Sequence, residues 1–263
     1  MQKYIKWLPI AGALVVVLFF GVWLTIRVKK FMSSQSGQPS AYVSQSPKTY
    51  QTKSYAELIG HIKGLTENQL KQHYDLYAGY VKKRNQIEQD LQTVERTDSA
   101  GITYSPFRAL KVAETFAVNG SLLHELYFEN MSSKQTQPGP ETMKLIMSSF
   151  GSLDNFKNDL IDSAAVARGW AVTAYGMDDG HMHNYVLESH NQNVPVLSIP
   201  LLVLDVYEHA YMIDFGIKRA AYLDVFWENV NWDVVEQRIK KWVLPLKLEA
   251  TRTVQPAKGA SAP

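Results

Sequence analysis

The chain contains no cysteine, so disulfide bonds and zinc sites built from thiolates are excluded, while the redox compartment stays open. It also has little net charge, because 27 basic residues stand against 25 acidic ones and give a formal balance of +2. No strong basic cluster lies in the part expected to fold, and the chain has no internal repeat. The charge pattern therefore argues against nucleic acid as a partner.

A hydrophobic content of 46% over 263 residues is enough to bury a core in one or two compact domains. The first 30 residues form a separate part. Within them, Trp7–Ile26 is an uncharged run of 20 residues. At about 1.5 Å per residue such a run spans a hydrocarbon layer of roughly 30 Å. It predicts a transmembrane anchor over residues 1–30.

A cleaved signal peptide is the alternative for this segment. The run exceeds the roughly 7–15 apolar residues of a signal peptide, and no small-residue cleavage motif follows it. Basic residues flank it on both sides, so the charge count does not decide its orientation. Lys3 and Lys6 with the long polar stretch after the run resemble an uncleaved export anchor. We therefore expect the folded part outside the cytoplasm, on the periplasmic or cell-surface side.

Two stretches have few large aliphatic residues. Residues 31–53 are rich in Ser, Gln, Thr and Pro, and residues 250–263 have the same character. Such segments cannot offset the conformational entropy that ordering costs. We predict a flexible linker and a disordered tail.

Residues 54–137 predict an antiparallel helical hairpin. A helical pattern runs from Tyr55 to about Val94, and a second runs from about Ser105 to Met131 after a break at residues 98–101. The first helix carries one face composed of Leu70, His73, Tyr77, Tyr80 and Val81. The inner face of the second carries Leu123, His124, Tyr127 and Phe128. Each helix thus places one histidine on its apolar side.

Pro138-Gly139-Pro140 marks a boundary, and residues 138–249 predict an α+β domain. Helical segments are expected at residues 141–149 and 153–166, and closing helices at residues 222–242. Between them, residues 170–175 and 182–188 predict a β-hairpin around Asp179-Gly180, with residues 199–206 as a third strand. The expected fold is a helical hairpin followed by a domain with a three-stranded antiparallel sheet.

Asp205 and His209 follow directly after the apolar run Ile199–Leu204, at the edge of a buried segment. Burying an ionised carboxylate costs several kcal/mol unless donors or a cation compensate it. A lone helical histidine is usually an ordinary core or surface residue. His73 and His124 each lie on the apolar side of a helix, so either one taken alone is interpreted as a core residue. By contrast, His61 is interpreted as a surface residue, and His181 with His183 as part of an edge strand.

Four further segments carry a resemblance. They are Asp205–Tyr211, Ser148–Phe156, Arg168–Trp170 and Phe226–Trp232. With the two histidines upstream, they resemble in order and spacing the motifs of the iron/manganese superoxide dismutases, from about Ser54 to Leu244. The resemblance implies the same fold, superoxide as the substrate, and one Mn or Fe ion per chain held by His73, His124, Asp205 and His209.

The resemblance also suggests residues around the metal. Asn191–Pro195 is similar to a manganese-type motif whose Gln contacts the metal-bound solvent, which makes Gln192 the first candidate for that role and His190 the reserve. Gly120 stands where iron members place their Gln, so manganese is slightly favoured. Tyr80 would be the gate tyrosine. Trp170, with Tyr127 and Phe128, would line the apolar wall.

Three positions depart from the family pattern: Tyr77 and Tyr207 replace a His and a Trp, and Met212 replaces a Tyr at the dimer interface. These departures leave an alternative open, a membrane-tethered metal-binding or structural homologue with little turnover. Glu208 and His209 are retained. In the family this pair bridges two subunits reciprocally, so the resemblance implies a homodimer.

Overall fold

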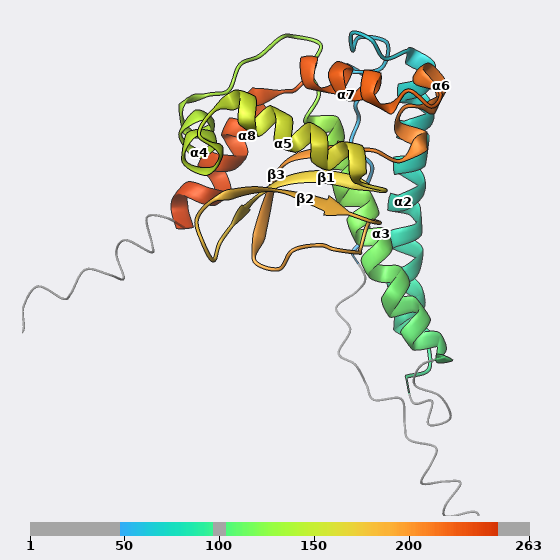
Figure 1. Cartoon of the computed structure of the whole chain (residues 1–263). Coiled ribbons are helices and arrows are strands. Elements are labelled where there is room, and N and C mark those ends of the chain that lie inside the picture. Colours follow the sequence, from blue (N-terminus) through green and yellow to red (C-terminus); the bar gives the residue numbers. More distant parts are fainter. Residues whose placement is uncertain (1–47, 97–103, 247–263) are drawn as a thin grey trace, which may run out of the picture. The chain divides into compact units, whose positions relative to one another are not determined.

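A computed structural model describes residues 48–96 and 104–246 (Figure 1). It separates residues 1–46 and 95–97 from the remainder of the chain, and the following concerns the described part of that remainder. The expected anchor Trp7–Ile26, most of the linker, the break at residues 98–101 and the tail at 250–263 lie outside the described residues. Among the described helices, none is both long and apolar enough to cross a membrane.

Two long helices form the predicted hairpin, α2 (Glu67–Thr93) and α3 (Pro106–Glu129), which lie side by side in Figure 1. Each begins at a hydroxyl cap. The Thr66 side chain accepts a hydrogen bond from the Gln69 amide, and the Ser105 side chain accepts one from the Arg108 amide. The hairpin is therefore confirmed, although its first helix starts later than we expected.

Residues 55–65 form a series of turns instead of the first turns of a helix. Hydrogen bonds of the i to i+3 type join Leu58 to Tyr55 and His61 to Leu58. Gly60 and Gly64 have φ angles of +78° and +86°, which interrupt a right-handed helix. At Gly64 an added Cβ would lie 2.9 Å from both methyl groups of Val225, so the close approach of the chain also requires glycine here.

The last residues of the expected flexible linker are packed against α2. The Tyr50 amide donates to Asn85 Oδ1 at 2.8 Å, and Asn85 Nδ2 donates back to the Tyr50 carbonyl at 2.8 Å. The Arg84 guanidinium lies 3.4 Å from the centre of the Tyr50 ring. The helical surface thus orders residues whose composition alone indicates flexibility.

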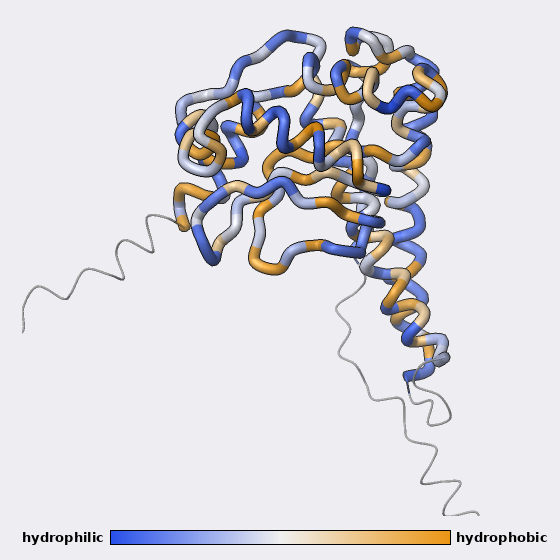
Figure 2. The backbone as a smooth tube through the Cα atoms, in the orientation of Figure 1, coloured by the Kyte–Doolittle hydropathy of each residue, from blue (hydrophilic) through white to orange (hydrophobic). Residues whose placement is uncertain are grey.

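The second half contains the predicted three-stranded antiparallel sheet. Its strands are β1 (Trp170–Gly176), β2 (Met182–Leu187) and β3 (Ser198–Asp205), in the order β2-β1-β3. Every residue of β1 is buried, and so are the last five residues of β3. Figure 2 colours part of this sheet orange, in keeping with its apolar sequence. Because Trp170 pairs with Asp205, the start of the central strand lies beside the end of β3.

Helices cover this sheet. Besides α3, the elements that contact it are α4 (Pro140–Phe150), α5 (Leu153–Val166), α8 (Trp232–Arg238) and a π-helical turn, η3, at Ile239–Val243, while α7 (Arg219–Glu228) packs against α5. Between β3 and α7 lie the 3₁₀ turn η2 (Glu208–Ala210) and the short α6 (Met212–Phe215).

The fully buried Asn130, at the end of α3, accepts hydrogen bonds from the Val203 amide and from Arg238, both at 2.9 Å. Since α3 carries His124 and β3 carries Asp205, this contact fixes two candidate ligands relative to each other.

Candidate metal centre

The structure brings the four predicted metal-binding side chains together from four different elements. His73 lies on α2, His124 on α3, Asp205 at the end of β3 and His209 in η2. One ligand atom from each lies within 4.8 Å of all the others. Residues separated by up to 136 positions therefore meet where the hairpin packs against the end of the sheet.

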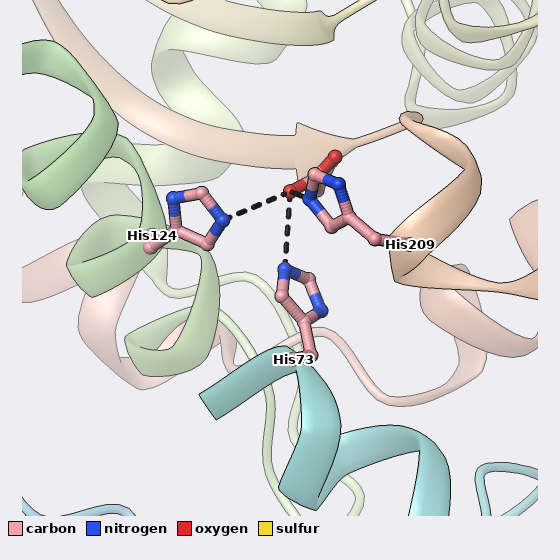
Figure 3. A group of neighbouring side chains, drawn as sticks. His73, His124 and His209 are labelled. Atoms are coloured by element: carbon pink, nitrogen blue, oxygen red, sulfur yellow. Dashed lines mark hydrogen bonds and ion pairs between the residues drawn. The ribbon is translucent and has the colours of Figure 1, made fainter. Parts of the chain in front are cut away.

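A single carboxylate oxygen is the centre of this group. The Nε2 atoms of His73 and His209 each lie 3.1 Å from Asp205 Oδ2, and His124 Nε2 lies 3.6 Å from it. Figure 3 shows the three imidazoles pointing toward one another around that oxygen. The other carboxylate oxygen, Oδ1, accepts a hydrogen bond from the Tyr207 amide at 2.9 Å.

Hydrogen bonds account for the approach of His73 and His209 to Asp205, but among the described residues none accounts for that of His124. His124 Nδ1 lies 2.6 Å from the Gly120 carbonyl, which can only accept, so this nitrogen carries the proton. His124 Nε2 is then an acceptor that faces the Asp205 carboxylate in a fully buried site, and no described residue hydrogen-bonds to it. Two buried acceptors that face each other need a cation between them. The donor set fits an Mn or Fe ion.

The electrostatics favour the protonation state that a metal requires at His73, His124 and Asp205, whereas at His209 they favour the charged imidazole, which must lose its proton to bind a metal. Burial lowers the pKa of His73 and lowers that of His124 far below the usual value. For Asp205, burial acts to raise the pKa, but the charge and hydrogen bonds of His209 and His73 outweigh it and hold the pKa well below its usual range. Burial also opposes the charged form of His209, yet the neighbouring Asp205 carboxylate raises its pKa. Neutral imidazoles and an ionised carboxylate are what metal binding needs.

His190, the reserve candidate, lies beside the four ligands. Its side chain is buried, and its ring centre is 5.8 Å from that of His124. Trp170 Nε1 can only donate and lies 2.9 Å from His190 Nδ1, so the proton of His190 is on Nε2. Burial lowers the pKa of His190 to about 4, which keeps the ring neutral near pH 7. The Nε2–H is a buried donor that lacks a partner among the described residues.

Gln192, the first candidate for contact with the solvent, is an exposed residue on the loop after β2. Gln192 lines a cavity beside Tyr80, and its contact with a metal-bound solvent stays a prediction; of the two candidates, His190 is the one whose ring lies against His124. The loop is held so that His190 points inward. Asn119 Nδ2 donates to the His190 carbonyl at 2.8 Å, and Asn191 Nδ2 donates to Thr115 Oγ1 at 2.9 Å.

Tyr80 lies next to this centre. Its ring is 5.1 Å from that of His124 and 4.7 Å from that of His190, and burial raises the pKa of its phenol to about 12. A cavity of about 780 Å³ between α2, α3 and residues 189–192 is lined in part by Tyr80 and Phe116. A Cβ added to Gly120 would lie 2.7 Å from the Tyr80 ring, so a longer side chain at position 120 does not fit with Tyr80 in this place.

The positions that depart from the family pattern have other partners here. Tyr77 is buried, and its hydroxyl donates to Glu125 Oε1 at 3.1 Å and accepts from the Lys53 amide at 3.0 Å. Tyr207 stacks on His209, with ring centres 5.2 Å apart. Met212 is 43% exposed, and Glu208 is exposed too.

Three residues for which the sequence predicted no role contact the site. Tyr222 donates to the Asp205 carbonyl at 2.7 Å, and Asn119 supports His190. The third is Gln69, which hydrogen-bonds to the His209 carbonyl. Only Gln69 had a local signal, because it is an amide four residues before His73 and so lies on the same side of the helix.

Comparison with known proteins agrees with this geometry. The family description "Iron/manganese superoxide dismutases, C-terminal domain" matches residues 138–238. A superoxide dismutase [Fe] of Aquifex aeolicus is 38% identical over 185 residues, which cover 69% of this chain and 87% of that protein. A superoxide dismutase [Mn] of Halobacterium salinarum is 30% identical over 189 residues, covering 71% and 91%. A superoxide dismutase [Fe] of Saccharolobus solfataricus is 34% identical, covering 65% and 83%.

The fold and the site define a protein whose described residues gather three histidines and one carboxylate into a candidate metal centre. The chain belongs to the iron/manganese superoxide dismutase family.

Proposed function

We propose that this protein disproportionates superoxide, converting two superoxide ions and two protons to one molecule of oxygen and one of hydrogen peroxide. The observation that carries the proposal is the convergence of three Nε2 atoms on one oxygen of Asp205. His73, His124, Asp205 and His209 would hold the ion. A bound Mn or Fe would supply the one-electron redox chemistry, alternating between its trivalent and divalent states.

The chain's own residues would manage protons and access. Tyr80 places a phenol between the cavity and His124, where it can hydrogen-bond to an entering small anion. Trp170 and the buried rings around the site restrict water, which strengthens every charge interaction inside it. Of the two features that favour manganese, Gly120 adjoins Tyr80 at the site, while Gln192 is exposed on the loop after β2.

Removal of one ligand tests the metal centre. His124→Ala should weaken binding of Mn²⁺ or Fe²⁺ by more than about 100-fold, since the loss of residues that merely support a ligand already costs 10–100-fold. Metal content of the purified protein, superoxide turnover and thermal stability with and without metal are the measurements. The exposed His61→Ala is the control and should match the wild type. Full metal content in His124→Ala would refute the site, and a metal-loaded wild type without turnover would favour the alternative of a non-catalytic homologue.

His190 has a separate proposed role: its Nε2–H donates to a solvent molecule in the metal site. His190→Leu removes this donor and should lower turnover about 10–100-fold with the metal retained, while His190→Gln, which keeps an N–H donor, should lose less. Gln192→Ala is the matched control on the same loop and should behave as wild type. Loss of activity in Gln192→Ala, with His190→Leu unaffected, would reverse the assignment.

The proposed homodimer rests on the family and on two retained residues. Glu208 is exposed beside the partly exposed His209, so its carboxylate is available to a second subunit's His209. A charge-assisted bond of this kind contributes about 1.5–3 kcal/mol. Glu208→Ala should therefore weaken both dimerisation and metal retention, measured by sedimentation and metal analysis. Asp162→Ala, on the exposed face of α5, is the control. A wild type that is monomeric at micromolar concentration would rule the idea out.

The membrane anchor and an extracytoplasmic folded part are also proposals, supported by Trp7–Ile26 and the long polar stretch after it. Reporter fusions after Ser54 that are active only outside the cytoplasm are expected. Activity of cytoplasmic reporters alone would contradict this placement.

A further inference from the structure

The four candidate ligands differ in how secondary structure supports them. His73 and His124 lie within helices of 27 and 24 residues, and Asp205 ends a strand of eight. His209 lies in η2, a 3₁₀ turn of only three residues, and its side chain is 28% exposed. A turn of this length has few hydrogen bonds of its own, so the position of His209 depends on contacts from outside the turn.

The chain after His209 does not continue as a regular helix. Tyr211 has φ −146° and ψ −20°, which separates η2 from α6. In a continuous α-helix the Ile213 amide would donate to the His209 carbonyl. Here the Gln69 side chain lies between these two groups. Its Nε2 donates to the His209 carbonyl at 2.6 Å, and its Oε1 accepts from the Ile213 amide at 3.1 Å.

Gln69 is itself rigidly held. Its side chain is fully buried, and its backbone amide donates to the Thr66 side chain that caps α2. It precedes His73 by four residues, so both side chains emerge from the same face of the helix. One turn of α2 thus carries the candidate ligand His73 and also hydrogen-bonds to the backbone of the candidate ligand His209. The ring centres of His73 and His209 are 5.0 Å apart.

We propose that Gln69 is a positioning residue for the metal centre: its amide replaces a missing backbone hydrogen bond and thereby sets His209 at the distance from His73 and Asp205 that metal binding requires. The proposal rests on the metal centre of the proposed function. Both hydrogen bonds of the Gln69 side chain go to backbone groups, so it acts through the backbone of His209.

A purely structural clamp is the competing explanation, and the same loop offers a control. Asp214 follows Ile213 in α6 and also connects this segment to the start of α2. Its carboxylate accepts hydrogen bonds from the Thr66 amide at 2.7 Å and from the Thr66 hydroxyl at 2.6 Å. Asp214→Ala removes a second link between the same two elements without touching His209. If a more mobile segment alone weakens Mn²⁺ binding, both variants should show the same loss of Mn²⁺ affinity.

The test compares Gln69→Met, which keeps the length of the side chain without its hydrogen bonds, with Asp214→Ala. Both should lower the melting temperature of the metal-free protein. Only Gln69→Met should weaken Mn²⁺ binding, by about 10–100-fold, and alter the EPR spectrum of bound Mn²⁺. Affinity is measured by competition with a chelator of known strength. Should Gln69→Met fail to fold, Gln69→Ala leaves room for water beside both backbone groups and enters the same comparison.

Equal Mn²⁺ affinity and identical EPR spectra in the Gln69 and Asp214 variants would overturn the positioning role and leave a structural clamp. A wild-type protein that binds neither Mn²⁺ nor Fe²⁺ would instead overturn the metal centre. The two failures are therefore distinguishable.

Discussion

The surrounding structure must compensate one buried carboxylate oxygen, Asp205 Oδ2. Three imidazole nitrogens lie within 3.6 Å of it. The tautomer of His124 prevents its Nε2 from donating to this oxygen. Burial would keep a free carboxylate protonated, but here its pKa stays low because histidines surround it. The site is therefore arranged for a cation, and each neighbouring element must hold its ligand without filling that space.

The ligand-bearing elements are held in place by hydrogen bonds between side chains and backbone groups. Asn130 joins the end of α3 to β3, Tyr222 holds the Asp205 carbonyl, and Gln69 holds the turn that carries His209. None of these three side chains is a candidate metal ligand. Together they reduce the motion of four side chains from distant parts of the chain, which is how a site reaches metal-binding geometry before the metal is bound.

The departures from the family pattern do not disturb this arrangement. Tyr77 turns its hydroxyl toward Lys53 and Glu125, which joins α2 and α3 to the segment before them. Lys53 Nζ in turn lies 2.8 Å from both Glu125 Oε2 and Glu129 Oε1. His190 stands near the metal site with Trp170 as its hydrogen-bond donor. A histidine therefore lies beside the four candidate ligands, which converge on one carboxylate oxygen.

Sequence by itself determined the two long helices, the three strands and the four candidate ligands, because helical spacing, strand length and short motifs are local properties. His73 and His124 lie on apolar helix faces, and Asp205 ends an apolar strand, so their residue types carry the signal. The tertiary structure alone decided that His190 rather than Gln192 faces the site, that Tyr50 is packed, and that Gln69 holds His209. Those facts depend on contacts with Trp170, Arg84 and the His209 carbonyl, each at least 20 residues away in the chain. No local pattern encodes such contacts, since hydrogen-bond partners become neighbours only when the chain is folded.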